Sequence, residues 1–151
     1  MLLLAEEKVQ KKRKKRAFYL RPINCLRLVR GEFEILIQEM ERMDSQYHKE
    51  YFRLTLEQLN DLLERVTPYL RRKPTHKYPI SVDARLCFTL RILASGDSLK
   101  SVQKSYRCAY DTARKIFHET CEAIWLALKD EFMALPDNNK WKSIAAEFWN
   151  E

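Results

Sequence analysis

Glycine and proline are scarce in this chain, which has two glycines and five prolines among its 151 residues. These residues are the commonest markers of tight turns, so their scarcity favours long helices with few turns between them. No segment alternates apolar and polar residues convincingly with a period of two, so we expect no β-sheet. With a hydrophobic content of 46%, the sequence predicts an all-α fold, a helical bundle.

Long hydrophobic runs are also missing. No run approaches the roughly 18 apolar residues that a membrane span needs, so we expect no membrane partner. The stretch Met1–Ala5 is too short for the core of a signal peptide and is followed by charged residues. We therefore expect an intracellular chain of about one domain, large enough to bury a core.

None of the four cysteines forms a Cys-x-x-Cys pair, and three of them, Cys87, Cys108 and Cys121, fall on apolar faces of predicted helices. This pattern favours reduced, buried thiols. Cys108, His118 and Cys121 lie close enough in the sequence to suggest zinc, but no fourth ligand appears at metal spacing. We therefore expect no metal site and no cofactor.

Charge is sorted into four blocks along the chain, whose formal net charge is +7. Residues 1–30 hold ten basic and two acidic side chains, and residues 65–118 hold twelve basic and three acidic. The blocks 31–64 and 119–151 are acidic, with net charges of −6 and −4. A basic block suits a nucleic acid, because each Lys or Arg that neutralises a phosphate releases a counterion.

The first basic block contains six consecutive cations, Lys11, Lys12, Arg13, Lys14, Lys15 and Arg16. Their mutual repulsion and the lack of apolar residues predict a disordered tail over residues 1–16. Such a run could act as a nuclear-import signal, as a nonspecific nucleic-acid arm, or only as a solubilising tail. The helical domain is expected to span residues 17–151, with the apolar segment 17–29 docked against its core.

Apolar residues at helical spacing predict a helix over Glu32–Met43. The next helix opens with a capping box formed by Thr55 and Gln58, and Pro68 is expected to end or kink it near Thr67. The basic, proline-containing stretch 71–77 is predicted to be a loop.

Two serines mark the starts of the following helices. Ser81 is expected to cap a central, buried helix that runs through Ala94 and stops at Gly96. Ser98 is expected to cap a short helix that buries Leu99, Val102 and Tyr106.

After a turn over residues 107–110, Asp111 is expected to cap a long helix that reaches Leu128. Its predicted apolar stripe comprises Ala113, Ile116, Phe117, Cys121, Ile124, Trp125 and Leu128. This succession of helix, tight turn and helix, within about residues 81–128, is typical of a helix-turn-helix.

A last helix follows the loop at residues 136–139 and places Trp141, Ile144, Ala145, Phe148 and Trp149 on one face. Leaving Phe148 or Trp149 in water forfeits roughly 1.5–3 kcal/mol for each side chain. We therefore expect them either to fold back onto the bundle or to be covered by a downstream domain.

In a helix-turn-helix, the first turns of the second helix meet base edges in the major groove of DNA. The outward residues there are Tyr110, Thr112, Arg114, Lys115 and His118. The preceding helix and turn offer Lys100, Lys104 and Arg107 for phosphate contacts. An alternative interpretation is that these cations only form a solvated face.

Several strings in the chain match one known family. They are Arg21–Asn24, Gly31–Phe33, Tyr51–Thr55, Leu59, Leu62–Leu63, Val66, Pro68–Tyr69, Pro79–Ser81, Arg85–Leu86, Thr89–Ser98 and Glu119–Trp125. With these strings the chain, over about residues 13–149, resembles the N-terminal region of PIF/Harbinger transposases and of the nucleases derived from them.

The resemblance implies a helical region with a helix-turn-helix, a nuclear (also cytoplasmic) location, double-stranded DNA as a ligand and a Myb-like protein as a partner. Two departures stand out. The family's turn usually reads like Arg-Ile-Ser-x-Ser-Thr-Val, whereas Arg107–Ala113 loses two hydroxyls and gains Asp111. Glu151 also lies where the family's metal-dependent nuclease domain would begin, so no residue here matches its catalytic acids.

The sequence thus predicts a DNA-binding or DNA-positioning module that is not an enzyme by itself. The alternative is a protein-interaction module, in which the acidic blocks and the last helix dock a Myb-like protein or a separate nuclease domain.

Overall fold

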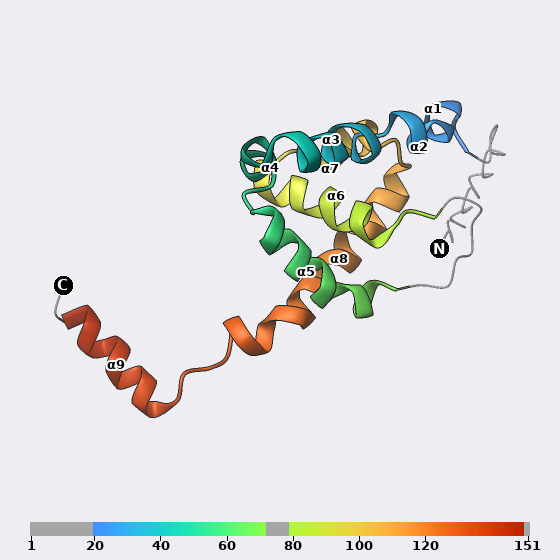
Figure 1. Cartoon of the computed structure of the whole chain (residues 1–151). Coiled ribbons are helices and arrows are strands. Elements are labelled where there is room, and N and C mark those ends of the chain that lie inside the picture. Colours follow the sequence, from blue (N-terminus) through green and yellow to red (C-terminus); the bar gives the residue numbers. More distant parts are fainter. Residues whose placement is uncertain (1–19, 72–78, 150–151) are drawn as a thin grey trace, which may run out of the picture.

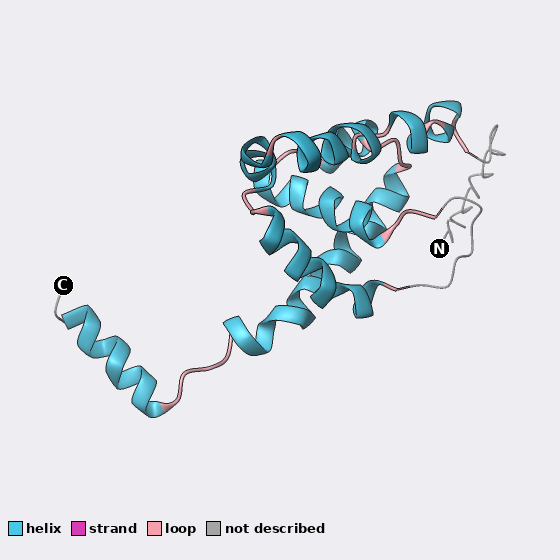
Figure 2. Ribbon diagram, viewed as in Figure 1, coloured by secondary structure: helices cyan, strands magenta, loops and turns pink. Residues whose placement is uncertain are grey.

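The computed structural model describes residues 20–71 and 79–149, and every regular element in these ranges is a helix (Figure 1, Figure 2). The all-α prediction is therefore confirmed for the described part of the chain. The cations 11–16 and most of the predicted loop 71–77 lie outside the described residues. In chain order the elements are α1 (Pro22–Cys25), α2 (Arg27–Arg30), the π-helical η1 (Phe33–Ile37), α3 (Gln38–Met43), α4 (Ser45–Phe52), α5 (Leu56–Leu70), α6 (Val82–Ser95), α7 (Leu99–Ser105), α8 (Tyr110–Phe132) and α9 (Asn138–Trp149).

Helix α6 lies at the centre of the packed elements η1 to α8, which we call the main body (Figure 1). Its seven consecutive residues Ala84–Leu90 are all buried, as the almost uniformly apolar sequence predicted. The Ser81 side chain accepts a hydrogen bond from the Ala84 backbone N–H (3.2 Å), and Gly96 ends the helix with a φ of 71°. Both predicted signals are confirmed.

Helix α5 begins as predicted, with a complete capping box between Thr55 and Gln58. Pro68 was predicted to end or kink this helix near Thr67; it does not end the helix there, which continues to Leu70. The Leu70 side chain is buried, and its carbonyl oxygen accepts a hydrogen bond from the buried guanidinium of Arg85 (2.5 Å). Tertiary contacts therefore stabilise the two helical residues beyond the proline, Tyr69 and Leu70.

The segment before the main body is held differently from the prediction. Helices α1 and α2 bury no residue, and Leu20, Ile23, Leu26, Leu28 and Val29 all remain exposed. The described part of the segment 17–29 therefore does not dock through its apolar side chains.

The predicted helix over Glu32–Met43 forms, with the π-helical turn η1 as its first half. Helix α4 is an additional helix that the sequence did not indicate.

Helix α8 is longer than predicted, and its predicted apolar stripe is confirmed only in part. It continues four residues past Leu128 to Phe132. Ala113, Ile116, Thr120 and Ala123 are its buried residues, and Trp125, expected to face inward, is 54% exposed. Ala113 and Ile116 of the predicted stripe are buried, and Phe117 and Ile124 are partly buried against the core.

Helix α9 stands away from the main body, joined to α8 by the segment Met133–Asp137 (Figure 1). The helix itself was predicted, but it does not fold back onto the body. None of its residues is buried, and Phe148 and Trp149 are 79% and 90% exposed. No helix within residues 20–71 and 79–149 is long and apolar enough to cross a membrane.

Candidate nucleic-acid interface

The short helix α7 is fixed against α6 by two buried side chains. Val102 and Tyr106 point into the core, and the Tyr106 ring packs edge-on against Phe88 with 5.2 Å between the ring centroids. Ser98 accepts a hydrogen bond from the Ser101 backbone N–H (3.2 Å), which confirms the predicted cap. The two lysines of the helix, Lys100 and Lys104, remain exposed.

The turn between α7 and α8 consists of Tyr106–Ala109 and carries Arg107 in the left-handed region, with a φ of 51°. Glycine is the usual residue at such a position because a Cβ atom is strained there. The Cys108 backbone N–H donates to Gln103 O (3.0 Å), which closes the turn.

The Arg107 side chain makes structural hydrogen bonds that the sequence did not indicate. Its Nε donates to Arg30 O (2.8 Å) and its guanidinium also donates to Ile23 O (3.1 Å). These bonds attach α1 and α2 to the turn across more than 70 residues of sequence. The predicted phosphate contact of Arg107 stays a prediction, and in this structure its side chain ties two segments of the chain together.

The start of α8 differs from the prediction in one respect that matters for anion binding. Ala109, not Asp111, occupies the N-cap position, and no side chain caps the helix. The prediction that Asp111 is the cap is therefore wrong. Asp111 lies inside the first turn and is exposed, where it interacts favourably with the helix dipole but adds negative charge to the surface.

The remaining predicted residues of α8 are all exposed. Tyr110, Thr112, Arg114, Lys115 and His118 are exposed in the first half of α8. Positions 111, 115 and 118 follow one another along the helix opposite the buried Ala113, Ile116 and Thr120. Lys115 lies 4.0 Å from the Glu119 carboxylate in an exposed ion pair, which contributes little to stability.

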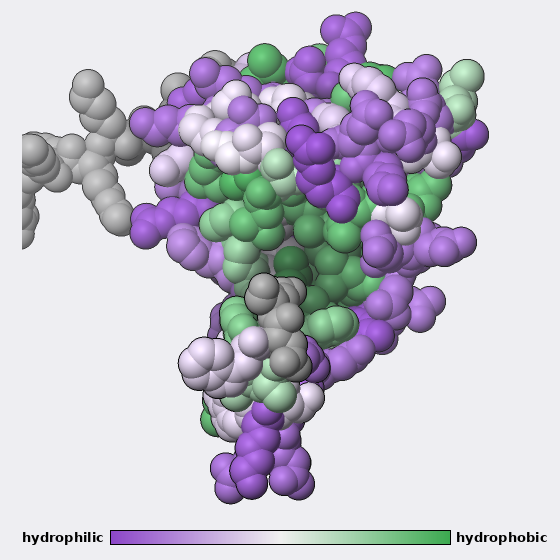
Figure 3. Space-filling model, turned by 90° about the vertical axis from the view of Figure 1, so that its left-hand side faces the viewer, coloured by the Kyte–Doolittle hydropathy of each residue, from purple (hydrophilic) through white to green (hydrophobic). Residues whose placement is uncertain are grey.

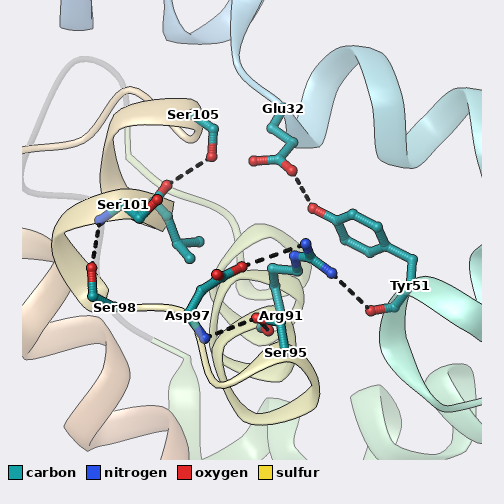
Figure 4. A network of polar contacts seen from close by, with 9 residues as sticks. Glu32, Tyr51, Arg91, Ser95, Asp97, Ser98, Ser101 and Ser105 are labelled. Atoms are coloured by element: carbon teal, nitrogen blue, oxygen red, sulfur yellow. Dashed lines mark hydrogen bonds and ion pairs between the residues drawn. The ribbon is translucent and has the colours of Figure 1, made fainter.

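A polar network joins α6 and α7 to the elements behind them (Figure 4). The Arg91 guanidinium lies 4.0 Å above the Tyr51 ring and 3.5 Å from the Asp97 carboxylate, and the Tyr51 hydroxyl donates to Glu32. Burial and the Glu32 carboxylate raise the pKa of Tyr51, so its hydroxyl stays protonated. The network ties Asp97, which lies just before α7, to α6 and α4.

A small pocket lies behind the turn, with a volume of about 110 Å³ and an apolar lining that includes Phe33, Phe88 and Ile116. Cys108 borders it, and burial raises the pKa of this thiol to about 11, although the nearby Arg27 acts in the opposite direction. The thiol is therefore protonated at neutral pH and has low reactivity as a nucleophile. Within the described ranges, no group of three or more His, Cys, Asp or Glu side chains is arranged to hold a metal ion.

Comparison with known proteins adds no assignment. No protein-family model, no curated protein and no solved structure matches this chain.

Proposed function

We propose that α7, its turn and α8 form a helix-turn-helix that binds double-stranded DNA. The observation that carries the proposal is four exposed cations on this pair of helices, Lys100 and Lys104 on the first helix and Arg114 and Lys115 at the start of the second. Two helices joined by a short turn with a left-handed residue are the form of this motif, and its second helix meets the major groove.

The two helices would have different tasks. Lys100 and Lys104 are placed to neutralise phosphates, which fixes the position of the protein without reading sequence. Arg114 and Lys115, with Thr112 and His118 beside them, would face base edges, where Arg or Lys can donate to guanine O6 and N7. Asp111 opposes this binding, because its carboxylate lies one helical turn before Lys115 and is not used as a cap.

The proposal is tested by titrating a labelled duplex of mixed sequence with the chain at several salt concentrations. If all four cations contact DNA, the logarithm of the association constant falls with the logarithm of salt with a slope of about −3.6. The double variant Lys100→Ala with Lys104→Ala reduces this slope to about −1.8. Arg114→Ala with Lys115→Ala weakens binding by roughly tenfold or more.

The matched control is Arg42→Ala with Lys49→Ala, which removes two exposed cations from α3 and α4. This control should bind as the wild type does. Asp111→Asn should bind more tightly, since it removes a negative charge from the same surface. Equal affinity of the wild type and the Arg114/Lys115 variant would refute the assignment of α8.

The resemblance to PIF/Harbinger transposases supports the same conclusion and refines it. It favours a nuclear chain that positions DNA, with Lys11–Arg16 as an import signal and a Myb-like protein as a partner. The family's metal-binding acids have no counterpart in this sequence, so we propose that this chain binds DNA and does not cut it. Conversion of supercoiled plasmid to its nicked form by this chain in the presence of Mg²⁺ would contradict the proposal.

The second candidate is a protein-interaction module, which the exposed Phe148 and Trp149 of α9 favour. In this alternative, the acidic blocks and α9 dock a Myb-like protein or a separate nuclease domain. A chain that binds no duplex even at low salt but retains a Myb-like protein in a pull-down would establish it.

A further inference from the structure

One face of α8 is apolar and uncovered in its second half. Trp125 and Phe132 are exposed there, and Cys121 before them and Leu128 between them are half-buried. These four residues follow one another at steps of four, three and four, so they share one side of the helix. We call this side the α8 face.

Helix α9 carries a second uncovered apolar surface, formed by Trp141, Ile144, Ala145, Phe148 and Trp149. It projects from the main body, and a broad hydrophobic area of the body remains open in the hollow beside it (Figure 3). The chain therefore holds two apolar surfaces that its own packing leaves in water, and each forfeits free energy as long as nothing covers it.

The linker keeps these two surfaces apart within one chain. It has five residues, Met133–Asp137, and includes Pro136, whose ring fixes its own φ and disfavours the helical region for Leu135. In this structure the linker leaves α9 projecting away from its own α8 (Figure 1). Short hinges of this kind favour exchange of an element between two copies.

The charges of the two surfaces are complementary. The second half of α8, residues 119–132, holds four acidic side chains and one basic, and the neighbouring α5 holds three acidic and one basic. Helix α9 holds two lysines, Lys140 and Lys142, and one acidic residue. Asp61 and Glu131 already pair with Arg65, so Lys140 and Lys142 would complement the other acidic side chains of this surface, such as Glu122 and Asp130.

We infer that two copies of this chain form a dimer in which α9 of each copy packs against the α8 face of the other. The contact is made twice around a two-fold axis, because the same surfaces face each other in both directions. Lys140 and Lys142 then lie near the acidic residues of α8. This dimer does not depend on DNA binding and leaves the first half of α8 exposed.

The test uses sedimentation velocity of the full chain over a range of concentrations. The wild type is expected to be a dimer. Two variants each remove one surface: Trp125→Glu with Phe132→Glu on the α8 face, and Phe148→Glu with Trp149→Glu on α9. Each variant alone should sediment as a monomer with an unchanged helical circular-dichroism spectrum.

Mixing the two variants gives the decisive result. The α8-face variant keeps an intact α9, and the α9 variant keeps an intact α8 face, so one of the two contacts can form. A one-to-one heterodimer in the mixture is expected. The matched control, Met43→Glu with Tyr47→Glu, changes two exposed apolar residues elsewhere and should remain a dimer.

Three outcomes would overturn the inference. A wild type that is monomeric at every concentration means that the surfaces stay open, close within one chain or bind another protein. Variants that dimerise as the wild type does place the contact elsewhere. Monomeric variants that do not associate when mixed mean that like surfaces pair with like.

Discussion

At the scale of single residues, His48 is the most consequential buried polar group. It is fully buried in α4 beside Phe52, with 4.9 Å between the ring centroids. Burial lowers the pKa of its imidazole more strongly than a backbone contact with Leu54 raises it. The ring is therefore neutral in the folded chain at neutral pH, whereas the unfolded chain titrates near pH 6.5.

This difference predicts a loss of stability on acidification. Below about pH 6.5 the unfolded state binds a proton that the folded state does not, so the free energy of unfolding falls by up to about 1.4 kcal/mol per pH unit. Urea titrations at several pH values between 5 and 8 measure this slope. His48→Leu should remove it, and Glu41, whose pKa burial raises, is common to both proteins and cancels in the comparison. Parallel slopes for the two proteins would contradict the prediction.

The long-range hydrogen bonds of Arg107 could not be predicted from the sequence. A cation beside a predicted turn suggested a phosphate contact, and its type and position were consistent with that task. Its bonds to Ile23 O and Arg30 O join segments more than 70 residues apart, and no local pattern indicates such a pairing. By contrast, Lys100 and Arg114 were placed on the exposed surface from helical spacing alone, and both are exposed.

At the scale of elements, local sequence signals predicted helix starts and ends correctly where the capping hydrogen bonds come from neighbouring residues. Ser81, Ser98 and the Thr55–Gln58 box all cap helices, and Gly96 ends one. They gave wrong limits in two places. In α5 a distant group intervenes, because Arg85 bonds to the carbonyl of Leu70 where the helix continues past Pro68. Helix α8 starts at Tyr110, ahead of Asp111, without any side-chain cap.

The cap at Ser98 supports a prediction at this scale. Helix α7 has seven residues, too few to be stable by itself, so it depends on its cap and its packing. Ser98→Ala should lower the free energy of unfolding by about 1 kcal/mol. Ser101→Ala, an exposed serine in the same helix, should change it by less than about 0.5 kcal/mol.

Chemical denaturation of the two variants measures this difference. Ser98→Ala should also weaken duplex binding, because α7 carries Lys100 and Lys104. A Ser98 variant as stable as the Ser101 variant would mean that packing alone holds α7.

At the scale of the whole molecule, the sequence located most helices but not their arrangement. Apolar periodicity predicted that α9 forms, yet nothing in it indicated whether α9 packs against the main body. Packing depends on which surfaces meet in three dimensions, and the linker that decides this for α9 is only five residues long.

The linker makes the architecture testable by limited proteolysis. Met133 and Leu135 are exposed outside any helix, so a protease that cleaves before large hydrophobic residues should cut there first within residues 79–149. Mass spectrometry of the early products should show a fragment that retains α8 and a separate fragment that contains α9. Met133→Asp with Leu135→Asp should slow this cut alone. A first cut inside α8 would show that the helix opens before the linker does.

The positions of the three tryptophans have a practical consequence. Trp125 lies on the α8 face, and Trp141 and Trp149 lie on α9; all three are more than half exposed. Their emission therefore reports the polarity around these two surfaces rather than the integrity of the core. An uncovered chain should emit at long wavelength and be quenched readily by iodide, while any occupant of either surface should shift the emission to the blue. The chain thus carries its own optical reporter for whatever binds there.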